Sequence, residues 1–153
     1  MGAHLVRRFF QSVAARPPDP AEEAWLMGLL NEAEQRHYRQ MSRADRSHAV
    51  RSARCPALAD DAQRVAAALH DVGKNRAGLG TMARVGATVA GALAPRWVRG
   101  RWAQYRDHPR LGAAMLAEAG SAELTVLWAA EHHLPPERST LPAALVAALA
   151  ASD

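Results

Sequence analysis

The chain has 153 residues, of which 49% are apolar, 5% aromatic and 22% charged. This length suits a single domain with a core of its own, and the composition is that of an ordinary soluble, helix-rich protein. The formal net charge is +4, and Lys74 is the one lysine among 19 basic residues. A basic balance can indicate nucleic acid, an anionic membrane or a phosphorylated small substrate, although arginines spread over solvated helix faces would explain most of it.

Cysteine usage and hydropathy bear on location. The single cysteine, Cys55, excludes an internal disulfide and favours a reduced, cytoplasmic compartment. Residues 1–12 lack the long apolar core and the cleavage site of a secretory signal. Residues 77–94 are dotted with glycine and carry Arg84, so they fit a core or surface helix better than a transmembrane segment.

Prolines, capping residues and apolar stripes predict a series of helices. The first is expected over residues 20–38, with Asp19 as its N-cap and Pro20 in its first turn. Ser42 and Ser121 are expected to cap two later helices. The later helices are predicted over 43–54, 58–70, 79–94, 109–119, 122–132 and from 142 onward. Because no alternating strand pattern and no internal repeat occurs, the predicted fold class is all-α, a single helical bundle.

Five of the seven histidines and two aspartates form an ordered series. They are His48, His70, Asp71, His108, His132, His133 and Asp153. Helical spacing places them at helix ends or inward faces. Buried polar groups need hydrogen bonds or a metal, and a shared cation in the bundle core would satisfy these side chains together. Singly, each has another explanation, as a hydrogen-bonded core residue, a helix cap or a charge at the chain end.

Three motifs carry a resemblance to a known family: Leu-His-Asp-Val-Gly-Lys at 69–74, Asp-His-Pro-Arg-Leu-Gly at 107–112 and Glu-His-His at 131–133. With His48 and Asp153 they resemble the HD-domain metal-dependent phosphohydrolase superfamily. The downstream histidines are most similar to the HD-GYP branch and related binuclear members, although Leu-Pro-Pro follows the last motif and Gly-Tyr-Pro is absent. The resemblance implies an HD domain over 42–153, preceded by an N-terminal segment, 1–41, with one helix packing on the core.

The resemblance also implies a buried site with two divalent metal ions. One ion would be held by His48, His70, Asp71 and Asp153, and the second by Asp71, His108, His132 and His133. Imidazoles with a bridging carboxylate favour Fe or Mn, with Mg, Zn and Ni as alternatives. Two such ions can hold a hydroxide and clamp the oxygens of a displacement. Lys74 would neutralise charge on a phosphoryl oxygen, or else offset a helix macrodipole as a C-terminal cation.

The expected function is therefore that of a metal-dependent phosphohydrolase acting on a nucleotide or another small phosphoester through a metal-bound hydroxide. Asp71 and Lys74 are its expected catalytic residues. One alternative is an oxygenase whose di-iron site on this fold resembles that of inositol oxygenase. The other is a non-catalytic HD module that binds a nucleotide or a partner.

A basic aromatic segment at 96–106 is the second feature with a bearing on ligands. Its arginines would suit phosphate groups, and Trp97, Trp102 or Tyr105 would suit stacking on a base. The two tryptophans would equally suit partly buried core positions, and the arginines a membrane or a partner protein. Nothing in the pattern gives a strong nucleic-acid signal, and the sequence leaves the oligomeric state open.

Overall fold

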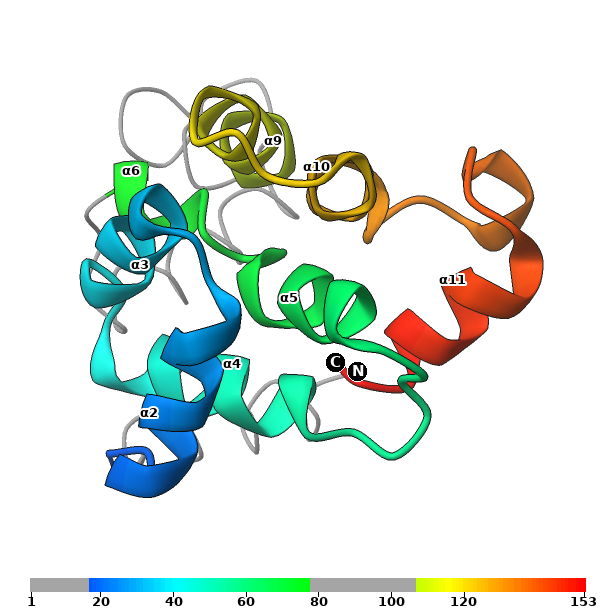
Figure 1. Ribbon diagram of the computed structural model, residues 1–153. Helices are drawn as coiled ribbons and strands as arrows, with labels where there is room; N and C mark the ends of the chain where they lie inside the picture. The colour runs from blue at the N-terminus through cyan, green and yellow to red at the C-terminus, as the bar shows by residue number, and fades with distance from the viewer. Residues whose placement is uncertain (1–16, 78–106) are drawn as a thin grey trace, which may run out of the picture.

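The computed structural model describes residues 17–77 and 107–153, and every regular element in these two ranges is a helix (Figure 1). The elements are α2 (Pro20–Leu29), α3 (Glu32–Arg39), α4 (Arg43–Ala53), α5 (Asp61–Leu69), α6 (Lys74–Ala77), α9 (His108–Glu118), α10 (Glu123–Glu131), the 3₁₀ helix η2 (Pro136–Arg138) and α11 (Ala143–Ala150). The all-α prediction is confirmed. The predicted helix at 79–94 and the basic aromatic segment at 96–106 lie outside the described residues.

Capping side chains explain where several helices begin. Asp19 Oδ1 accepts hydrogen bonds from the amides of Ala21 and Glu22 at the start of α2, with Pro20 in the first turn. Ser42 Oγ accepts from the amide of Asp45 at the start of α4. Both capping residues agree with the prediction from the sequence.

Three predicted boundaries are wrong for local reasons. The helix predicted over 20–38 is two helices, α2 and α3, because Asn31 and Glu34 form a capping box that starts α3. The helix predicted from 58 begins at Asp61, since Asp60 caps it through the amide of Gln63 at 2.8 Å. Ala122, rather than Ser121, is the N-cap of α10, and it makes no side-chain capping bond.

Helix α5 lies at the centre of the bundle (Figure 1). Its residues 65–69 are buried, and it packs against α4 on one side and α10 on another. One core cluster includes Leu26, Val50 and Leu116 with Leu69, and a second gathers Trp128, Val146 and Leu149 around Ala66 and Ala67. Burial of this apolar surface fixes the C-terminal end of α5 deep in the molecule. Nowhere in the two ranges is a helix both long and apolar enough to span a bilayer.

Two glycines let the turn after α5 approach α9 closely. A Cβ on Gly73 would lie 2.0 Å from the carbonyl oxygen of His108 and 2.7 Å from the amide nitrogen of Gly112. A Cβ on Gly112 would in turn lie 3.1 Å from the amide nitrogen of Gly73. Only residues without a side chain permit this backbone contact. It brings the His70-Asp71 turn beside the first residue of α9.

Candidate metal centre

All seven residues of the predicted series meet in one region. His48 comes from the middle of α4, His70 ends α5, and Asp71 lies in the turn that follows. His108 is the first residue of α9. His132 and His133 follow α10, and Asp153 follows α11. Five helices therefore supply the side chains, which is the construction expected of a metal site in a bundle core.

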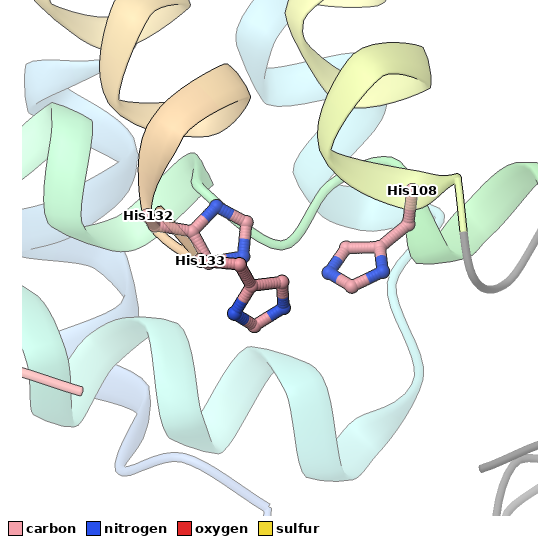
Figure 2. Close-up of side chains that lie close together, drawn as sticks. All are labelled: His108, His132 and His133. Carbon is pink, nitrogen blue, oxygen red and sulfur yellow. The ribbon is translucent and has the colours of Figure 1, made fainter. Parts of the chain in front are cut away.

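The side chains form two groups with the spacing of metal ligands. In one, ligand atoms of His48, His70 and Asp71 lie within 4.8 Å of one another. The other consists of His108, His132 and His133, with the same limit. In Figure 2 these three imidazoles converge from the start of α9 and the end of α10.

The Asp71 carboxylate belongs to the first group and also faces the second. Its Oδ1 lies 3.3 Å from His108 Nε2 and 3.8 Å from His132 Nε2. Its Oδ2 lies 3.6 Å from His70 Nε2. One oxygen therefore faces each group, as the two oxygens of a bridging carboxylate would.

Asp153 joins the group around His70 from the outer side. Its Oδ1 lies 3.2 Å from His48 Nε2 and 3.7 Å from His70 Nε2. The hydrogen bond from His48 lowers the pKa of Asp153 below its ordinary value. The side chain is 34% exposed, so this part of the cluster is reached by solvent.

Two of the buried histidines are oriented by main-chain carbonyls. Nδ1 of His70 donates to the carbonyl of Ala67 at 2.8 Å, and Nδ1 of His132 to that of Ala129 at 3.0 Å. With the proton on Nδ1, the lone pair of Nε2 points into the cluster, which is the usual arrangement of a metal-ligating histidine. His132 Nε2 is buried and makes no hydrogen bond, so a cation there would satisfy an otherwise costly polar atom. These residues therefore fit a bound metal.

The protonation states of these histidines and of Asp71 also suit metal binding. Burial lowers the pKa of His70, of His133 and, to about 3, of His132, so these imidazoles are neutral at pH 7. Burial by itself raises the pKa of Asp71, but Lys74, His70 and His108 hold it well below its usual range. Neutral imidazoles and an ionised carboxylate are the forms that bind metals.

Lys74 lies beside the cluster at the start of α6, and its ammonium pairs with Asp71 Oδ2. Lys74 also follows the C-terminal end of α5, so its alternative role as a cation that offsets a helix macrodipole stays a prediction. Its partner is the central carboxylate, and its side chain is 20% exposed, within reach of solvent.

Two residues of the site were missed by the sequence interpretation. Glu131 was noted within its motif without a role, but its buried carboxylate accepts bonds of 2.7 to 2.8 Å from Ser139 Oγ and from the amide and hydroxyl of Thr140. It thereby ties the loop after His133 back to α10. Arg51 donates to His48 Nδ1 at 2.9 Å. Its spacing of three residues from His48 on one helix was the signal that could have identified it.

Burial by itself raises the pKa of Glu131, and the hydrogen bonds from Ser139 and Thr140 bring it below its ordinary value. An ionised carboxylate in this position accepts bonds more strongly than a neutral acid or amide would. No sequence spacing predicts that Ser139 and Thr140 contact Glu131, because they are loop residues eight and nine positions after it.

Comparison with known proteins agrees with this geometry. The family model of the HD domain matches residues 46–151, which is more than half of the chain. The match includes His48 and the motifs at 69–74, 107–112 and 131–133. Neither a search of curated proteins nor a search of solved structures found a match.

Proposed function

The chain belongs to the HD domain family, a superfamily of metal-dependent phosphohydrolases, and we propose that it hydrolyses a nucleotide or another small phosphoester with two bound metal ions. The observation that carries the proposal is the position of Asp71, whose two oxygens face two separate histidine groups. A single carboxylate placed in this way can serve two cations at once.

The proposed ligands divide between the two ions as the side chains do. His48, His70 and Asp153 would hold one ion, His108, His132 and His133 the other, and Asp71 both. The mixture of imidazole and carboxylate donors favours Fe or Mn. Bound there, the ions would supply positive charge at the phosphoryl group and a water nucleophile of lowered pKa.

The chain's own residues supply orientation and charge. The carbonyls of Ala67 and Ala129 hold His70 and His132 so that Nε2 of each faces Asp71. Lys74 carries a positive charge next to the central carboxylate, where it would stabilise charge that develops on a phosphoryl oxygen. The exposed edge of the cluster is formed by His133 and Asp153, so a small phosphoester can approach from that side.

Metal content and turnover test this proposal together. Protein purified without chelators should contain about two Fe or Mn per chain by elemental analysis. It should hydrolyse p-nitrophenyl phosphate, bis(p-nitrophenyl) phosphate or a nucleotide in a substrate panel. Asp71→Asn should lose both metals and activity, whereas Asp61→Asn, an exposed aspartate on α5, should keep them. Two metals retained in Asp71→Asn would contradict the bridging role.

Lys74→Met separates charge stabilisation from metal binding. Its metal content should equal that of the unaltered protein, while kcat falls by about 100-fold, the loss typical of one transition-state donor. An unchanged kcat would show that Lys74 only balances the charge of Asp71.

Failure would also be informative about the alternatives. A mixed-valence di-iron signal with oxygen consumption would indicate the oxygenase. Metal binding without turnover of any phosphoester would indicate a binding module. No metal even after reloading would mean that the histidine series is structural.

A further inference from the structure

The hydrogen bond from Arg51 implies that His48 has the opposite tautomer to that of His70 and His132. A guanidinium can only donate hydrogen bonds, so His48 Nδ1, 2.9 Å from the Arg51 terminal nitrogen, must accept. The proton of the neutral imidazole is then on Nε2, the atom that faces Asp153 Oδ1 at 3.2 Å. In His70 and His132 the arrangement is the reverse, because their Nδ1 atoms donate to carbonyls.

This difference matters for metal binding at the outer group. A metal ion needs the lone pair of His48 Nε2, and that nitrogen carries the proton as long as Arg51 occupies Nδ1. If the proton moved to Nδ1, that N–H and the Arg51 guanidinium would both be donors and could not form a hydrogen bond with each other. Binding of a metal through Nε2 and the Arg51–His48 hydrogen bond therefore exclude each other.

A groove beside Arg51 could hold an anion that its guanidinium would bind once the bond to His48 is broken. Arg51 lines a groove of about 690 Å³ formed by the start of α2, the C-terminal half of α4 and residues 151–153, so the groove reaches the cluster at Asp153. Other charges in its wall are engaged: Arg54 pairs with Glu22 at 3.2 Å, and Asp19 caps α2. Within residues 17–77 and 107–153, Arg51 forms no ion pair, and its observed partner is an imidazole.

We propose that Arg51 exchanges between two partners. In the metal-free protein it holds His48 in the tautomer that cannot ligate through Nε2. Metal binding at the outer group breaks this hydrogen bond, and the freed guanidinium then binds an anionic oxygen of the ligand in the groove. That the anion is a phosphoryl group rests on the proposed function. Arg51 is in this way a positioning residue for His48 and a contact for substrate.

The first test reads the tautomer and the metal affinity without any substrate. In the metal-free protein, side-chain ¹⁵N shifts should show His48 protonated on Nε2, with Nδ1 as the acceptor of the Arg51 hydrogen bond. An Mn²⁺ titration followed by the EPR signal of the free ion should show one binding step tightened about 3- to 10-fold in Arg51→Met, the range expected for one hydrogen bond. Arg54→Met, the matched cation one turn later, should change neither reading.

A double-mutant cycle assigns the effect to His48. In a His48→Ala background, Arg51→Met should no longer tighten the Mn²⁺ binding step. The proposal is overturned if His48 in the unaltered protein is protonated on Nδ1. It is overturned equally if Arg51→Met binds Mn²⁺ no more tightly, or if the gain persists without His48.

The second test uses inorganic phosphate with the Mn²⁺-loaded protein. Calorimetry should show phosphate binding weakened by about tenfold or more in Arg51→Met, as for a lost charge-assisted bond. It should be unchanged in Arg43→Met, an exposed arginine at the start of α4 that does not line the groove. Equal phosphate affinity in the unaltered protein and Arg51→Met would overturn the exchange. None of these readings depends on turnover, so a protein that passes them but hydrolyses no phosphoester would disprove only the proposed function.

Discussion

The inner and outer parts of the cluster are held in place by different means. His70 and His132, whose side chains are 2% and 1% exposed, donate to carbonyls of the helices they end. His48 and Asp153, at 18% and 34%, are held by side chains, namely Arg51 and each other. Helix backbone cannot move without loss of the core, whereas side-chain partners can exchange. The inner part is therefore fixed by the backbone, whereas in the proposed exchange the outer part would adjust when a metal or ligand binds.

The largest effect is expected from a change that separates the parts of the inner cluster. In Gly73→Ala the new methyl group would meet the carbonyl of His108 at 2.0 Å, so α9 and the Asp71 turn must move apart. We expect a loss of about 3 kcal/mol in the free energy of unfolding, with impaired metal binding.

Gly28→Ala is the control for that change, because nothing lies within 4 Å of its new Cβ in α2. In this variant the free energy of unfolding should increase by about 0.5 to 1 kcal/mol. Urea unfolding of both variants decides the matter, and an unaltered stability in Gly73→Ala would show that the backbone contact is not tight.

The preorganised inner histidines should also make the metal-free protein sensitive to acid. The pKa of His132 is about 3 in the folded protein against an ordinary 6.5, so below pH 6.5 protons bind the unfolded chain first. Stability is then highest above pH 6.5 and falls by about 1.4 kcal/mol per pH unit for this group until the pH reaches about 3.

Chemical unfolding of chelated protein between pH 7 and pH 4.5 measures this slope. In His132→Phe the slope of stability against pH should be smaller by about 1.4 kcal/mol per pH unit, which corresponds to one proton. An identical slope in the variant would mean that His132 is not buried as a neutral imidazole.

A smaller effect, confined to one histidine group, is expected from Glu131→Gln. The amide is a weaker acceptor for the Ser139 and Thr140 donors, so the loop after His133 should be held less firmly. One of the two proposed metals should bind about tenfold more weakly, the usual cost of losing a supporting contact.

Glu137→Gln, on the exposed η2 helix, should have no effect on metal affinity. If Glu131→Gln weakened both metals equally, its role would be general stability instead of support for the His132 group.

Much of the fold followed from local signals. Asp19 and Ser42 cap helices where predicted, because capping depends on residues within one turn. The break at Asn31 was missed although it too is local, since the apolar stripe appeared continuous through Leu29 and Leu30 and outweighed the Asn31–Glu34 capping box. The seven site residues were predicted as a set and lie together, but the assignment of each to a metal remains a prediction.

The sequence alone determined the helical class, several helix boundaries and the residue types that meet at the cluster, because periodicity, caps and motif spacing are properties of short stretches. Only the tertiary structure decided which oxygen of Asp71 faces which histidine group, that Ser139 and Thr140 hold Glu131, and that Arg51 contacts Nδ1 of His48. These contacts depend on the relative positions of packed helices and on rotamers chosen in the folded chain. Neither is fixed by any local stretch of residues.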